Sequence, residues 1–78
     1  MFDIIESAKT IINYCDDGDL MSALSYFEGE VRPHISVMES NDHVELFECM
    51  KTALGAIDDE DWSVALEIVD KMSVILNG

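Results

Sequence analysis

The chain has 78 residues, and 17 Asp and Glu against four Lys and Arg give it a formal net charge of −13 at neutral pH. Phosphate contacts need Lys and Arg, so this charge argues against direct binding of nucleic acid and of an anionic membrane surface. The hydrophobic fraction of 49% is too high for a disordered acidic tail, and the length leaves room for one folded domain.

Large apolar residues recur at helical spacing in four segments, at residues 4–15, 20–31, 46–57 and 62–75. Each segment would form a helix with one apolar face, and none shows the alternation of a half-buried strand. We therefore expect an all-α, four-helix fold of two stacked helical hairpins in a single domain. The hairpins are expected over about residues 2–32 and 42–77, joined by a connector over about 33–41.

Pro33 interrupts the middle of the chain. A proline has no N–H group, and its ring clashes with the preceding helical turn. We expect Pro33 either to end or kink the second helix near Val31 or Arg32, or to start a separate short turn from His34 to Met38.

An internal repeat with an offset of 42 residues relates the two hairpins. Residues 16–24 and 58–66 share the pattern Asp-Asp-x-Asp, a large apolar residue, two variable positions and Ala-Leu. Each acidic cluster follows one helical segment and precedes the next, so the repeated unit is helix, tight acidic turn, helix. Trp62 is expected to be the core anchor of the second hairpin, because its counterpart Leu20 is apolar too.

Several acids stand where helix caps belong. Asp19 and Asp61 are expected to be N-caps, because their carboxylates can accept hydrogen bonds from the free N–H groups of the following turn. Asp42 with Glu45 can form a capping box for the third helix. Capping thus explains part of each acidic cluster.

The first copy of the repeat resembles the second half of a tetratricopeptide repeat, which runs aromatic, Gly-Asp, small, apolar, aromatic. The matching residues are Tyr14, Gly18, Asp19, Ala23, Leu24 and Phe27 in the first copy, and Ala53, Asp61, Trp62, Ala65 and Leu66 in the second. The chain departs from the family in its period of 42 rather than 34, in Glu60 at the turn glycine, and in lacking the closing proline. The resemblance implies a groove that binds a peptide or protein.

Clustered carboxylates are also the ligands of calcium. The best twelve-residue EF-hand window runs from Asp17 with Asp19 and a closing Glu28, but Met21 and Ser22 occupy the fifth and sixth positions, where a ligand and a glycine are needed. The soft metal ligands Cys15, His34, His43 and Cys49 lack the close pairs of a zinc site. We therefore expect no metal and no cofactor.

Nothing in the sequence predicts an enzyme. Neither histidine has a Ser or Cys at an evident nucleophile spacing. Two cysteines are too few for a disulfide scaffold, and the start of the chain is acidic, without the basic and apolar regions of a signal peptide. A cytoplasmic protein is the expectation.

The remaining acidity favours a strongly basic protein as the partner. In size and charge the chain resembles the small acidic immunity proteins and inhibitors of bacteria and phages, which implies a protein that blocks a nuclease-type toxin or mimics nucleic acid. The acids expected to bind the partner are those of the two turns that capping does not explain: Asp16, Asp17, Asp58, Asp59 and Glu60.

Two alternatives stay open at this point. A tetratricopeptide-like chaperone or adaptor would hold a partner helix in an apolar groove, and Met21, Tyr26, Met38 and Met72 would then matter. The acidic coat could also serve solubility alone. The sequence leaves both a monomer and a homodimer open.

Overall fold

The structure is a computed structural model that describes residues 3–35 and 43–77, and this part of the chain is all-α without a strand. Its helices are, in chain order, α1 (Ile4–Asp16), α2 (Leu20–Tyr26), the π-helical turn η1 (Phe27–Val31), α3 (Arg32–Ile35), α4 (Val44–Asp58) and α5 (Trp62–Asn77). Because α2, η1 and α3 follow one another without a break, the described residues form four helical segments. The expected all-α fold with four helices is confirmed.

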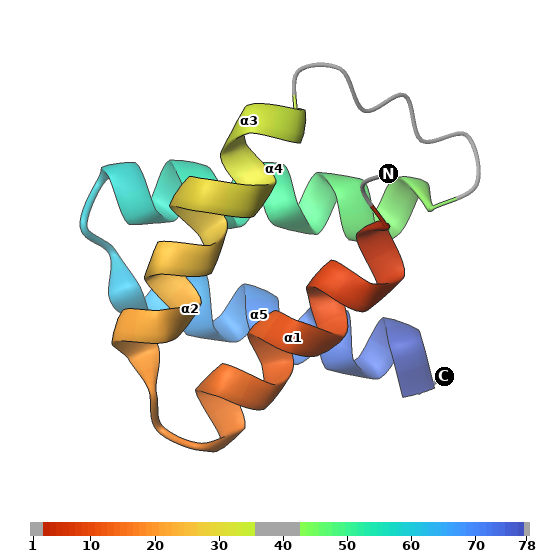
Figure 1. The fold of residues 1–78 in the computed structure, drawn as a ribbon, viewed down its shortest axis with the longest axis horizontal. Helices are drawn as coiled ribbons and strands as arrows, with labels where there is room; N and C mark the ends of the chain where they lie inside the picture. Colours follow the sequence, from red (N-terminus) through yellow and green to blue (C-terminus); the bar gives the residue numbers. More distant parts are fainter. Residues whose placement is uncertain (1–2, 36–42, 78) are drawn as a thin grey trace.

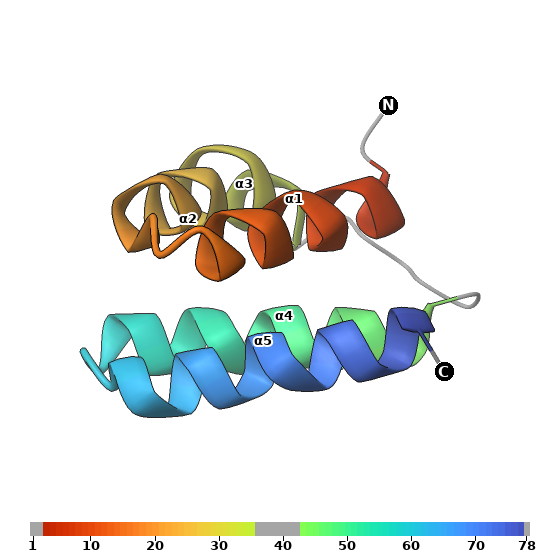
Figure 2. The ribbon, with the colours of Figure 1, turned by 90° about the horizontal axis from the view of Figure 1, so that it is seen from below.

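The four segments lie in two layers. Figure 2 shows α1, α2 and α3 in one layer and the antiparallel pair α4 and α5 in the other. The first hairpin crosses the second obliquely, so that α1 runs across α5 while α3 lies over α4 (Figure 1). Each layer thus buries its apolar face against the other layer.

The two turns of the repeat have the same backbone geometry. The N–H groups of Asp17, Gly18 and Asp19 donate to carbonyls of residues 13, 15 and 14, and those of Asp59, Glu60 and Asp61 donate to residues 55, 57 and 56, each 42 positions later. This pattern includes the six-residue hydrogen bond of a Schellman motif, which places one residue in the left-handed region. Gly18 has φ of 74° and Glu60 has φ of 58°. The repeat is therefore structural as well as sequential.

One expected outcome at Pro33 was that the second helical segment ends near Val31 or Arg32. The segment does not end there. It continues to Ile35, and the turn before the proline widens into η1, where the Arg32 N–H donates to the Phe27 carbonyl, five residues back. A regular α-turn would bring the proline ring against the carbonyl of Gly29. The wider π turn relieves this clash, so the chain changes its hydrogen bonding instead of breaking the helix.

The third helix begins one residue later than a capping box at Asp42 requires. Its N-cap is His43, whose side chain makes no capping hydrogen bond. Asp42 itself lies outside the described residues. The first helix, in contrast, has a capping side chain. The Asp3 carboxylate accepts hydrogen bonds from the N–H groups of Ile5 and Glu6 at the start of α1, a role that the apolar pattern of the sequence did not indicate.

The core is formed by the apolar faces of the four segments. Its members are Ile4, Ala8, Ile11, Phe27, Val31, Leu46, Met50, Ala53, Leu54, Ile68, Val69 and Met72. All twelve belong to the apolar faces expected from helical spacing. Two large residues of the expected apolar faces, Leu20 and Trp62, do not belong to this core and are 42% and 44% exposed. The expectation that Trp62 anchors the core is therefore wrong.

Candidate protein-binding surface

The two acidic turns, at residues 16–19 and 58–61, lie on the same side of the molecule. Both are found away from the chain ends marked N and C: at the left of Figure 2, and at the bottom and the left edge of Figure 1. The tight turn between α1 and α2 and the tight turn between α4 and α5 project seven carboxylates there. The oblique crossing of the two layers separates the turns, and the first residues of α2 and α5 lie between them.

Asp19 and Asp61 start the helices that follow the turns. The N–H and Oγ–H groups of Ser22 donate to the Asp19 carboxylate over 3.1 and 2.7 Å, and these bonds lower the pKa of Asp19. The N–H of Val64 donates to the Asp61 carboxylate over 3.4 Å, a longer bond. Both carboxylates thus have a role in folding.

The other acids of the turns occupy positions that folding does not favour. Asp16 and Asp58 are the last residues of α1 and α4, and Asp17 and Asp59 are their C-caps. A helix C-terminus carries partial negative charge, so a carboxylate there is unfavourable, and a Lys or Arg is the residue that stabilises it. Neither helix has a basic residue in its last turn. Four acids are therefore placed against the helix dipoles.

One cation of the protein reaches the turns. The Arg32 guanidinium binds Glu28 over 2.7 and 2.8 Å and Asp58 over 2.7 Å, which raises the pKa of Arg32 and lowers that of Glu28. This network connects α3 to the end of α4. Within residues 3–35 and 43–77, no ion pair involves Asp16, Asp17, Asp59 or Glu60. Asp58 is thus already partnered, while the other four acids of the predicted set are available.

An apolar pocket of about 300 Å³ lies between the two turns. Its lining contains residue pairs related by the 42-residue repeat, among them Leu20 and Trp62, Leu24 and Leu66, and Cys15 and Ile57. Phe27 and Val69, which are likewise related, line it with buried side chains. In a stack of repeats each unit follows the last in the same direction. Here equivalent residues of the two hairpins line one shared pocket. The expected tetratricopeptide-like stacking stays a prediction.

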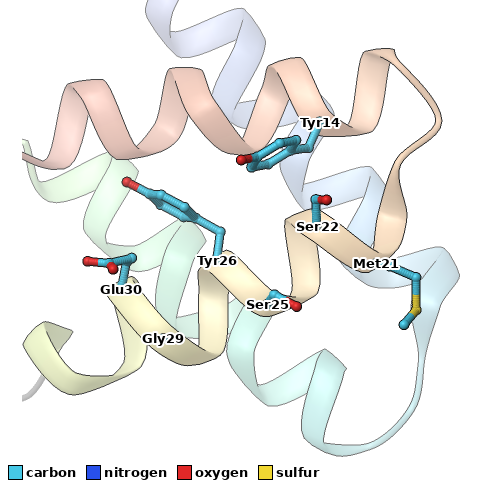
Figure 3. A pocket seen from close by; sticks show the side chains of 7 residues that line it. All are labelled: Tyr14, Met21, Ser22, Ser25, Tyr26, Gly29 and Glu30. Atoms are coloured by element: carbon cyan, nitrogen blue, oxygen red, sulfur yellow. The ribbon is translucent and has the colours of Figure 1, made fainter.

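A second, more open hollow of about 360 Å³ lies between α1 and α2 (Figure 3). The rings of Tyr14 and Tyr26 make a tilted contact there with centroids 6.4 Å apart, and the Tyr26 hydroxyl donates to Ser7 Oγ over 3.1 Å. Tyr26 thus lines the hollow and contacts two residues of α1, Ser7 and Tyr14. Glu30 brings the one charge in the lining of this hollow.

The methionines expected to line a partner groove have different positions. Met21 is 77% exposed and lines both the pocket and the hollow. Met72 is fully buried in the core, so its expected place in a groove is wrong. Met38 lies outside the described residues.

The remaining chemistry-bearing side chains do not converge. No three His, Cys, Asp or Glu side chains in the described parts of the chain come together to hold a metal ion. Cys15 and Cys49 are free cysteines, and burial is the first cause that raises the pKa of each thiol. His34 Nδ1 lies 2.7 Å from the Glu30 carbonyl. No helix among the described residues is long and apolar enough to cross a membrane.

Comparisons with protein-family models, curated proteins and solved structures found no match to this chain. The acidic turns were predictable from the sequence, because the repeat marks them. The pocket was not, although the pairing of Leu20 with Trp62 and of Leu24 with Leu66 is visible in the repeat. Helical spacing alone assigns these four residues to apolar faces and cannot tell a filled core from an open pocket.

Proposed function

We propose that this protein is a small acidic binding module that neutralises a strongly basic protein partner. The observation that carries the proposal is the placement of Asp16, Asp17 and Asp59 at helix C-termini, where negative charge disfavours folding and no ion pair among the described residues offsets it. Solubility alone would be served by acids anywhere on the surface. Acids kept at unfavourable positions of two equivalent turns support a role in binding.

The partner class follows from the charge. A protein with clustered Lys and Arg, such as a nuclease-type toxin or another nucleic-acid-binding enzyme, presents a surface built for phosphates. Carboxylates held on two rigid turns can occupy such a surface, and opposite fields raise the rate of association. The proposed role is that of an immunity protein or nucleic-acid mimic, and it needs no catalytic step.

The test compares two variants, each with four acids changed to Lys: one in the acidic turns and one elsewhere on the surface. One variant changes Asp16, Asp17, Asp59 and Glu60 to Lys. The control variant changes acids outside the turns and outside the first turns of α1 and α4 to Lys, namely Glu30, Glu48, Glu67 and Asp70, so that both variants have the same net charge. Both are used in parallel with the natural protein to capture partners from the source cell, and the association rate with the captured protein is then measured against salt.

We expect the turn variant to lose the partner and the control variant to keep it. The association rate of the natural protein should fall steeply from low to physiological ionic strength. The turn variant should also be at least as stable as the natural protein, because Lys at a helix C-terminus is favourable. Its loss of binding could then not be assigned to unfolding. Equal capture by the turn variant and the natural protein would refute the proposal.

A further inference from the structure

The apolar pocket between the acidic turns is the feature that charge alone does not explain. Leu20, Met21, Trp62 and Leu66 line it and are 42%, 77%, 44% and 38% exposed. Single exposed apolar residues are common on protein surfaces, but several around one pocket mark an interaction site. Tryptophan is also the residue type most enriched among those that dominate binding energy.

Aspartates of both turns are direct sequence neighbours of residues that line the pocket. Four residues of its lining, Cys15, Leu20, Ile57 and Trp62, are each followed or preceded directly by an aspartate of the turns. Any occupant therefore meets apolar walls in the middle and carboxylates at either side. A fatty acid or another anionic ligand would be repelled by these carboxylates.

A second copy of this chain is opposed by the same charges. Two chains of net charge −13 would bring their acidic turns together if one entered the pocket of the other. A partner segment with Lys or Arg has the complementary charge. The volume of about 300 Å³ is at the lower end of the range for small-molecule pockets, roughly 300 to 1,000 Å³, and suits a few side chains of a larger partner.

We propose that the pocket binds an amphipathic segment of the basic partner, with apolar side chains at its centre and Lys or Arg on both sides of them. This inference rests on the proposed function and adds the chemistry of the bound segment. The two-sided arrangement of charge follows from the repeat, since equivalent residues of both hairpins line the pocket and each hairpin carries an equivalent acidic turn next to them. Leu20, Trp62 and Leu66 supply the apolar contact, and the acids of the turns bind the flanking cations.

The test uses Trp62 as an internal reporter, because it is the one tryptophan of the chain and lies at the pocket. Three synthetic 14-residue peptides without aromatic residues serve as probes. The first has leucines at helical spacing in the centre and lysines on both sides. The second replaces the leucines with serine, and the third has the composition of the first with all lysines at one end. Each is titrated while the emission of Trp62 is followed at physiological salt.

We expect the first peptide to bind most tightly and to shift the emission of Trp62 to shorter wavelength. Leu66→Asn should weaken its binding about three- to tenfold, because a bound leucine can cover only the 38% of the Leu66 residue that is exposed in the free protein. Val74→Asn is the matched control, because Val74 lies on the same helix, is 71% exposed and does not line the pocket. Its affinity should stay within about twofold of the natural protein, as for a surface residue outside the interface.

Other outcomes would overturn the inference. Equal binding of the leucine and serine peptides, with no change in Trp62 emission, would leave the proposed function standing and remove the pocket from it. If Leu66→Asn and Val74→Asn lower the affinity for the first peptide equally, the peptide does not bind in the pocket. If the first and third peptides bind with equal affinity, the cations on both sides of the leucines are not recognised. A salt-promoted dimer of the protein that Leu66→Asn abolishes would identify a second copy as the occupant instead. Failure of every peptide would reject the inference, while the capture experiment would still decide the proposed function.

Discussion

The left-handed position in each acidic turn allows one prediction to be worked out closely. Gly18 and Glu60 are equivalent in the repeat and have φ of 74° and 58°, in backbone turns with the same hydrogen bonds. A residue with a Cβ atom is disfavoured in this region by about 1–2 kcal/mol, whereas glycine is not. Glycine loses more freedom on folding, which opposes this gain by roughly 0.5–1 kcal/mol. Glu60→Gly should therefore stabilise the protein by about 0.5–1 kcal/mol.

The assay is thermal unfolding followed by far-ultraviolet circular dichroism. For a domain of this size, 1 kcal/mol corresponds to about 4–8 °C in Tm, so Glu60→Gly should raise Tm by about 2–8 °C. The variant also removes a charge from a crowded turn, and Glu60→Gln controls for that effect, since it removes the charge while keeping the Cβ atom. The reciprocal change Gly18→Gln should lower Tm. If Glu60→Gly is no more stable than Glu60→Gln, the reasoning from backbone conformation is wrong.

Three further predictions concern the core, a cap and a thiol. Met50→Ala truncates a fully buried side chain and should lower the free energy of unfolding in urea by about 2–5 kcal/mol; a loss below about 1 kcal/mol would place Met50 outside the tightly packed core. Hydrogen bonds from Ser22 lower the pKa of Asp19 in the folded state, so ionised Asp19 stabilises the fold at any pH above the ordinary pKa of an aspartate. This stabilisation is lost as the pH falls from that ordinary pKa to the lowered pKa of the folded state. Asp19→Asn keeps a capping oxygen, so its Tm should fall less steeply with acid than that of the natural protein; parallel acid titrations would contradict this. Burial, followed by the nearby acids Asp16 and Asp70, raises the pKa of Cys15, so iodoacetamide should alkylate this thiol more slowly than N-acetylcysteine at neutral pH. Unfolding in urea should restore the rate, as followed by mass spectrometry, and an unchanged rate would show that folding does not protect the thiol.

The sequence was sufficient for the features that depend on neighbours along the chain. Helical spacing predicted the apolar faces, including Ile11, Met50 and Met72, because residues three or four apart share one side of a helix whatever the helix packs against. The repeat marked both acidic turns and the positions of Asp19 and Asp61 at the starts of the following helices. It also related Gly18 to Glu60, although glutamate gives no local indication of a left-handed turn.

The response to Pro33 depended on the surrounding structure. A proline cannot make the regular helical hydrogen bond, and the sequence allows the chain either to stop or to distort there. The buried side chains of Phe27 and Val31 lie on the turn before it and belong to the core. Their packing favours a distorted helix over a broken one, so the chain forms η1 and continues to Ile35.

The charge of −13 and the repeat are properties of the sequence alone. They identify the turns as the densest acidic sites, and they argue against a nucleic-acid partner, which stays a prediction. Tertiary structure decided what lies between the turns. Leu20 and Trp62 have the spacing of core residues, but they are 42% and 44% exposed and line the pocket. Side chains with the spacing of core residues therefore line an open pocket, because periodicity specifies the apolar face of a helix and only packing specifies what covers it.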